Sequence, residues 1–291
     1  MVYFFQQLLN ALQLGSLYAL IALGYTLVYG VLSLINFAHG DVFMVGAFLC
    51  FLLVTFLGLS FLPALLLTMA GTALLGVMIE RLAYKPLRQA PRVSVIITAL
   101  GVGLILEHLM LLVYPYPQHV PTLLPIRLWH LGGLTLSSLQ VIIILASLGL
   151  MVALDRLVHR TALGVAMRAL SWDRATVSLM GVPVNRVLSI TFGIGAALGG
   201  AAGVMYSQAY PVIDPYMGVM VGWKAFIAAV IGGIGVIRGA MLGGFILAAV
   251  EVLVAAFLPS TYRDVVAFGL LFALLLCRPH GLLGTPRIQK V

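Results

Sequence analysis

Long apolar segments recur along the whole chain and are separated by short polar stretches. Each is close to the 18–20 residues that a helix needs to cross a bilayer. A membrane β-barrel would require alternating apolar and polar positions, and these segments do not alternate. The pattern therefore predicts helical spans at residues 8–30, 42–59, 61–80, 93–114, 138–155, 187–208, 239–258 and 264–277.

A further segment, 219–237, is apolar but interrupted by glycines, and the placement of positive charge decides its status. Twelve of the 16 Lys and Arg residues lie in 81–92, 156–186 and 278–290. Short cytoplasmic loops carry such an excess of positive charge. All three basic segments face the same side only if 219–237 crosses as well. The sequence thus predicts an all-α polytopic membrane protein of about 8–9 transmembrane helices, with a periplasmic N-terminus and a cytoplasmic C-terminus.

Composition agrees with a single transmembrane domain over residues 1–291. Hydrophobic residues make up 63% of the chain and charged residues 8%, too few to coat a soluble protein of this size. The net charge of +8 does not indicate a nucleic-acid partner, because no basic stretch carries the interleaved aromatics of a single-strand binder. The surroundings of this chain are expected to be a lipid bilayer.

The segment 115–137 falls on the outer face and is rich in proline, glycine and histidine. We expect an irregular loop or a short interfacial helix there, with Trp129 near the lipid headgroups.

Two polar, glycine-bearing interruptions, 30–41 and 232–239, occupy comparable places in the two halves of the chain. Broken helices leave backbone groups that need protein or water as partners, and paired breaks occur at binding or gating regions of transporters. Tight loops at the membrane surface would give the same spacing, and the sequence does not choose between the two.

Few polar side chains remain inside the expected spans, and each is costly in hydrocarbon. The candidates for a translocation path or gate are Asn36, His39, Asp41, Glu107, Lys224 and Glu251. Plainer roles exist for five of them. Lys224 could extend to the interface, the two glutamates could be neutral packing acids, and His39 and Asp41 could cap the following helix rather than form a metal or proton relay.

Glycines spaced four apart form two small-residue ridges, for which close helix packing is the expected role. The ridges comprise Gly195, Gly199 and Gly203, and Gly235, Gly239 and Gly243. No phosphate-binding loop, H-E-x-x-H, C-x-x-C or G-x-S-x-G motif occurs. We therefore expect no catalysis by this chain, no bound metal and no cofactor.

The loop 156–186 is too long for a simple connection. Ser171 can cap a short helix with Asp173 in its first turn, and Gly181 can end it. Trp172, Ala175 and Leu179 would form an apolar stripe on that helix. Such a helix could dock into a partner protein or lie on its own bundle, and periodicity does not decide.

Several residues of this loop resemble the cytoplasmic coupling motif of ABC-importer permeases, and of the branched-chain amino-acid permease family in particular. They are Arg168, Ala169, Asp173, Ala175, Gly181 and Val182. With Trp172 and Arg186 they make up the candidate ATPase-coupling residues of this loop. Residues 15–48 and 224–251 resemble the same family, so the likeness covers nearly the whole chain. One departure is that Ala169 is followed by Leu170 and Ser171, without the glutamate that some importers carry.

This resemblance implies a permease subunit in the bacterial inner membrane that imports branched-chain or other hydrophobic amino acids. It also implies a second, homologous permease subunit, two cytoplasmic ATPase subunits that use the ATP, and a periplasmic substrate-binding protein. Two alternatives remain open. The same machine could carry urea, short amides or other amino acids, or the chain could be an ion-coupled secondary transporter working through Glu107 and Glu251.

Overall fold

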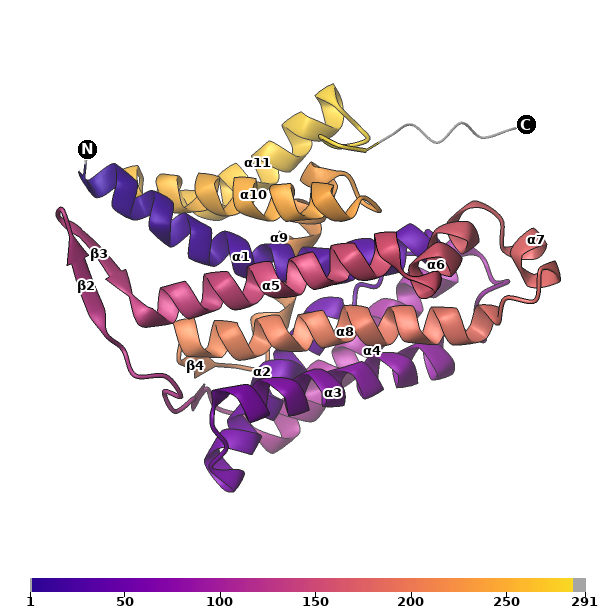
Figure 1. Ribbon diagram of the computed structural model, residues 1–291, viewed down its shortest axis with the longest axis horizontal. Coiled ribbons are helices and arrows are strands. Elements are labelled where there is room, and N and C mark those ends of the chain that lie inside the picture. The colour runs from indigo at the N-terminus through magenta and orange to yellow at the C-terminus, as the bar shows by residue number, and fades with distance from the viewer. Residues whose placement is uncertain (1, 285–291) are drawn as a thin grey trace.

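The computed structural model describes residues 2–284, apart from the side chains of Leu131, Arg174 and Ala175. It is a bundle of helices that run roughly side by side (Figure 1). All nine predicted spans are helical: α1 (Val2–Leu32), α2 (His39–Leu57), α3 (Phe61–Ile79), α4 (Arg92–Val113), α5 (Ser138–Arg160), α8 (Val184–Ala209), α9 (Met217–Gly232), α10 (Ile237–Phe257) and α11 (Tyr262–Cys277).

Seven of these helices are long and apolar enough to cross a membrane, when α3 is counted together with the π-helical turn η1 (Glu80–Tyr84) that continues it. The other two, α9 and α11, have 16 residues each. At 1.5 Å per residue they are only ~24 Å long, which is shorter than the hydrocarbon core of a typical bilayer. The predicted fold class and the range of 8–9 spans agree with this arrangement.

Helices α1 and α8 lie at the centre of the bundle and are its most buried spans. Helix α1 packs against α10, and α8 packs against α3. Glycine permits the close approach at both places. A Cβ on Gly244 of α10 would lie 2.5 Å from the backbone nitrogen of Ala19, and one on Gly76 of α3 would lie 2.7 Å from the carbonyl oxygen of Phe192. In lipid, where helices gain little from apolar burial, such contacts hold a bundle together.

The outer connections contain short strands. A hairpin of β2 (Leu128–Leu131) and β3 (Leu134–Ser137) projects from one end of the bundle (Figure 1), and β1 (Gln118–His119) pairs with β4 (Val212–Ile213). The expectation of an irregular loop over 115–137 holds for residues 120–127 and is wrong for 128–137, where the hairpin forms. The physical reason is the Gly132–Gly133 pair, whose positive φ angles of 56° and 87° form a tight hairpin turn.

The loop 156–186 contains two short helices, α6 (Ala162–Trp172) and α7 (Arg174–Leu179), rather than one. The prediction that Ser171 caps a helix is wrong, because Ser171 lies inside α6 and donates a hydrogen bond to the Arg168 carbonyl. Asp173 performs the capping instead, since its Oδ1 accepts from the backbone N–H of Thr176. The predicted stop at Gly181 is confirmed by its φ of 80° just beyond α7.

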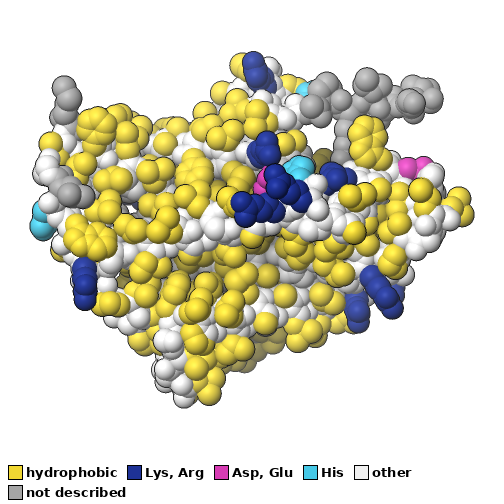
Figure 2. Space-filling view, viewed as in Figure 1, with side chains coloured by type: hydrophobic (Ala, Val, Ile, Leu, Met, Phe, Trp, Pro, Cys, Tyr) yellow, Lys and Arg dark blue, Asp and Glu magenta, His cyan; other side chains and the backbone are white. Residues whose placement is uncertain are grey.

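Apolar side chains cover most of the surface in the view of Figure 2, with basic side chains confined to a few groups. Helices α3, α4, α5 and α11 expose many large apolar residues, among them Leu74, Ile97, Leu104, Leu145 and Phe272. A soluble protein rarely exposes so much contiguous apolar surface. This face is suited to lipid or to another membrane subunit.

Candidate functional site

The two predicted interruptions lie beside each other in the bundle. A Cβ placed on Gly30, near the end of α1, would lie 3.4 Å from the carbonyl oxygen of Gly235 in the α9–α10 connection. Both connections have unusual backbone, with Ser33 at φ 54°, Gly233 at φ 104° and Gly235 at φ 95°. The two halves of the chain therefore meet through their broken segments, as the halves of many transporters do.

Asn36 ties the first interruption to η1, the π-helical turn that continues α3. Its side-chain oxygen accepts a hydrogen bond of 2.9 Å from the Tyr84 hydroxyl. The Tyr84 ring packs against Phe192 of α8, with ring centroids 4.9 Å apart. The connection between α1 and α2 is thus held by contacts to two other helices.

His39 is almost completely buried where α1, α2 and α8 meet. Only glycines leave room for its ring, since a Cβ on Gly24 would lie 2.1 Å from His39 Nε2 and one on Gly199 would lie 3.2 Å from its Cε1. The ring packs edge-on against Tyr25 at 4.8 Å, and Nε2 has no hydrogen-bond partner among the described residues. His39 does not cap α2, because Ala38 occupies the N-cap position without a side-chain hydrogen bond.

Asp41 lies in the first turn of α2 and is buried against α4 and α9. Gly103 and Gly218 make room for its carboxylate, because a Cβ on either would come within 3 Å of an Asp41 oxygen. Glu107 of α4, also buried, interacts with Asp41 electrostatically. No group of three or more His, Cys, Asp or Glu side chains in residues 2–284 could hold a metal ion.

Lys224 and Glu251 form the centre of a separate polar cluster. Lys224 Nζ lies 3.2 Å from Glu251 Oε2 and 3.0 Å from Asp264 Oδ1. The Tyr18 hydroxyl donates to the same Glu251 oxygen at 3.0 Å. Sequence reasoning missed Tyr18 and Asp264, since neither stands out among its neighbours. The cluster joins α1, α9, α10 and the start of α11.

The six candidate path residues therefore fall into separate groups rather than one site. Asn36 and His39 lie within the first interruption, Asp41 interacts electrostatically with Glu107, and Lys224 pairs with Glu251. The two glutamates suggested for ion coupling belong to different groups.

The first glycine ridge lies on α8 where it meets α1 and α2. A Cβ on Gly195 would lie 3.3 Å from the Gly24 carbonyl oxygen, and one on Gly203 would lie 2.5 Å from the Phe43 carbonyl oxygen. Gly199, between them, contacts His39.

The second ridge was predicted in part wrongly, because Gly235 precedes α10 and is not part of the helix. Its positive φ shows that it serves the turn instead. Gly239 and Gly243 face α9, where added Cβ atoms would lie 2.3 Å from the Gly232 carbonyl oxygen and 1.9 Å from the Ala228 carbonyl oxygen.

The loop that resembles a coupling motif presents an apolar surface at its tip. The side chains of Trp172, Leu179 and Met180 are 91%, 88% and 77% exposed. Ala175, predicted to lie in the same stripe, has a side chain outside the described residues. Large apolar groups exposed to this extent on the polar side of a membrane mark an interaction surface. We call Trp172, Leu179 and Met180 the tip patch.

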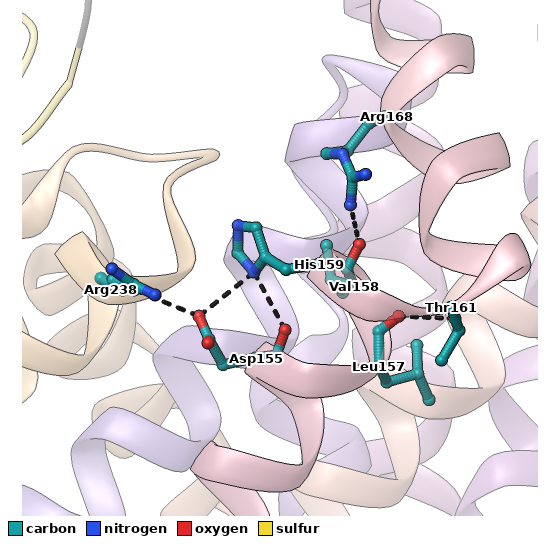
Figure 3. A network of polar contacts seen from close by, with 7 residues as sticks. All are labelled: Asp155, Leu157, Val158, His159, Thr161, Arg168 and Arg238. Atoms are coloured by element: carbon teal, nitrogen blue, oxygen red, sulfur yellow. Dashed lines mark hydrogen bonds and ion pairs between the residues drawn. The ribbon is translucent and has the colours of Figure 1, made fainter.

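Arg168 connects this loop to the bundle, as Figure 3 shows. Its guanidinium donates to the backbone carbonyl of Val158 at the end of α5. One turn earlier, Asp155 pairs with His159 at 3.2 Å and with Arg238, at the start of α10, at 3.3 Å. A chain of contacts thus runs from α6 through the end of α5 to the helix that follows the second interruption.

The burial of the remaining motif residues differs from one to the next. Ala169 and Val182 are half-buried, and Arg186 is exposed at the start of α8. Sequence reasoning missed a buried ion pair near them. The Glu80 carboxylate accepts from Arg88 and from Ser189, at 2.6 Å for the serine. The carboxylate thereby connects η1 to α8.

Interrupted helices, buried polar clusters and the exposed apolar tip patch are the features of a multi-span membrane transport protein. The family described as "Branched-chain amino acid transport system / permease component" matches residues 7–275. This chain belongs to that family.

Several branched-chain amino acid permeases are similar to this chain over more than 90% of its length. The chain is 41% identical to BraD, the permease protein of the high-affinity branched-chain amino acid transport system of Pseudomonas aeruginosa, over 99% of this chain and 98% of that protein. It is 40% identical to LivH of Escherichia coli K12 over 100% and 98%, and 28% identical to a probable LivH of Methanocaldococcus jannaschii over 94% and 91%. No solved structure matches. The protein is therefore a multi-pass inner-membrane permease subunit and not an enzyme.

Proposed function

We propose that this chain is the permease subunit of an ATP-driven importer of branched-chain and other hydrophobic amino acids. The observation that carries the proposal is the full-length similarity to permeases named for high-affinity branched-chain amino acid transport. The similarity includes the loop that resembles a coupling motif and both interrupted segments.

The machine we propose has several other parts. A second, homologous permease subunit completes the membrane pathway, and a periplasmic binding protein delivers the amino acid. Two cytoplasmic ATPase subunits dock on the tip patches and hydrolyse ATP, and this chain binds no cofactor itself. The N-terminus is periplasmic and the C-terminus cytoplasmic, in accord with the basic segments 81–92 and 156–186 at one side.

The contacts around Arg168 suggest how the ATPase moves the permease. Closure of the ATPases displaces α6 and α7, and the bond from Arg168 to Val158 carries this displacement to α5. The Asp155–Arg238 pair extends it to the start of α10, beside the meeting point of the two interruptions. The ATPase shifts the population between outward-open and inward-open states because it binds the loop differently in each.

Two alternatives are less well supported. An importer for urea, short amides or other amino acids would have the same architecture, but the relatives named here are branched-chain amino acid permeases. An ion-coupled transporter would use Glu107 and Glu251 together, whereas Glu251 is paired with Lys224 and Glu107 faces Asp41.

Copurification tests the proposal. The tagged chain, extracted in mild detergent from its native membrane, should bring down an ATPase. Arg168→Gln removes the link to α5, and Gly181→Val strains a backbone with φ of 80°, so both changes should reduce the recovered ATPase. Gly101→Ala is the matched control, because nothing lies within 4 Å of its Cβ position. Recovery of the permease without any ATPase would contradict the proposal.

A further inference from the structure

A cavity of about 360 Å³ lies between the first half of α1, the end of α8, the second half of α10 and the start of α11. These helix ends lie on the same side of the bundle as the β2–β3 hairpin (Figure 1), which is the periplasmic side in the proposed orientation. Its volume is at the small end of the range for ligand sites. It is therefore large enough for a small metabolite and too small for a peptide.

The α1 wall of the cavity is polar, which is unusual for a helix that crosses lipid. Gln7, Asn10 and Gln13 line the cavity and, being three residues apart, lie on nearly one face of α1. Asn10 also bonds Gln7 and Gln140 of α5, so the amides form a short ladder. Amides facing hydrocarbon would lose hydrogen bonds, whereas a water-filled path satisfies them. The α1 wall thus indicates a polar path.

Glu251 is the deeply buried acid of the lining, at 2% exposure. Its Oε2 accepts from Tyr18 and pairs with Lys224. Its Oε1 is buried and has no hydrogen-bond partner among the described residues. A buried carboxylate oxygen without a partner is costly, and an N–H donor from a ligand would remove that cost.

The cavity also has charged and apolar groups in and beside its lining. Glu251 and Asp264 are two acidic groups that share the one basic group of Lys224, so the cluster has one more acid than base. Arg263, which is exposed, supplies a positive charge to the same lining. Leu14, Val252 and Ala255 add apolar surface between these groups. The lining therefore offers one negative group, one positive group and an apolar wall.

We propose that this cavity is a transient binding site on the import path for the head group of a zwitterionic amino acid. The ammonium group binds Glu251 Oε1, the carboxylate is directed to Arg263, and an apolar side chain lies against Leu14 and Val252. This inference deepens the proposed function and rests on it. The site is expected to be weak, because an importer must release its substrate onward.

Equilibrium binding with matched analogues tests the site. The full transporter, with its partner permease and ATPases but without the binding protein, is titrated with leucine, with leucinamide and with 4-methylpentanoate. Leucinamide keeps the ammonium group and lacks the carboxylate, and 4-methylpentanoate does the reverse. Leucine should bind about tenfold more tightly than either analogue, since each loses one charge-assisted contact.

Two variants assign the contacts to residues. Glu251→Gln should weaken leucine and leucinamide about tenfold and leave 4-methylpentanoate unchanged. Arg263→Gln should weaken leucine and 4-methylpentanoate and leave leucinamide unchanged. Arg127→Gln, an exposed arginine at the outer face that does not line the cavity, is the control and should change none of the three. Because Arg263 is exposed, its variant folds and decides the matter even if Glu251→Gln does not.

Absence of leucine binding by the wild-type transporter at millimolar concentration would overturn the proposal. So would equal binding of all three compounds, or variants that weaken them without regard to charge. Uptake of leucine from the loaded binding protein is measured in parallel. If uptake is normal while the cavity binds nothing, the site is wrong and the importer function stands. If ATP-driven uptake is itself absent, the proposed function fails.

Discussion

Replacing Trp172 by Ala should weaken docking of the ATPase without disturbing the permease. The side chain is 91% exposed, so the fold loses little when it is removed. A tryptophan can bury ~200 Å² at an interface. If docking covers about half of that area, ~100 Å² leaves water, which is worth ~2.5 kcal/mol at 25 cal/mol per Å². This corresponds to roughly 60-fold in affinity.

The affinity is measured by titrating the purified ATPase against the permease in lipid nanodiscs. Trp129→Ala is the matched control, because Trp129 is 45% exposed but belongs to the outer hairpin. Its affinity for the ATPase should equal that of the wild type. Unchanged docking of the Trp172→Ala permease, or equal losses for both variants, would refute the claim that the tip patch is the docking surface.

Three other substitutions test the bundle itself. Gly243→Ala places a Cβ 1.9 Å from a backbone oxygen of α9 and should lower the thermal midpoint in detergent by more than 10 °C, whereas Gly269→Ala, with nothing within 4 Å, should leave it unchanged. Arg88→Gln leaves the buried Glu80 carboxylate without its cation and should lower the free energy of unfolding by about 3 kcal/mol. The double variant Arg88→Gln/Glu80→Gln removes both charges and should lower it by less. Tyr84→Phe removes one hydrogen bond to the α1–α2 connection and should cost about 1 kcal/mol in thermal or denaturant unfolding.

The helical spans could be predicted because a bilayer imposes one rule on every spanning segment. Helix α4 occupies 92–113 where 93–114 was expected, and α8 occupies 184–209 where 187–208 was expected. Helix α9 is only 16 residues long and its own hydropathy did not identify it. It was predicted because the three basic segments can face the same side only if this segment also crosses the membrane.

The cytoplasmic loop shows where local signals become ambiguous. The sequence predicted a single short helix capped by Ser171. The structure uses Thr161 for α6 and Asp173 for α7. Met167 of α6 is buried at 1% exposure, and α6 continues past it to Trp172, so Ser171 lies inside the helix.

The polar clusters could not be predicted from the sequence, because they form through tertiary contacts that no local pattern encodes. Tyr18 and Glu251 are 233 residues apart, and nothing near either residue points to the other. Glu107 and Glu251 looked alike as isolated acids within apolar spans, yet the bundle gives one a lysine partner and directs the other toward Asp41. Their separation is a property of the packing of α4 and α10, and only the structure reveals it.

The central claim is that ATP hydrolysed by a docked partner drives substrate through this chain. Proteoliposomes carrying the complete transporter, with ATP only on the side of the basic loops and leucine-loaded binding protein on the other, test it most directly. The account predicts leucine accumulation against its gradient that requires ATP, survives a protonophore and falls sharply with Trp172→Ala. Accumulation without ATP that collapses with the proton gradient would contradict it.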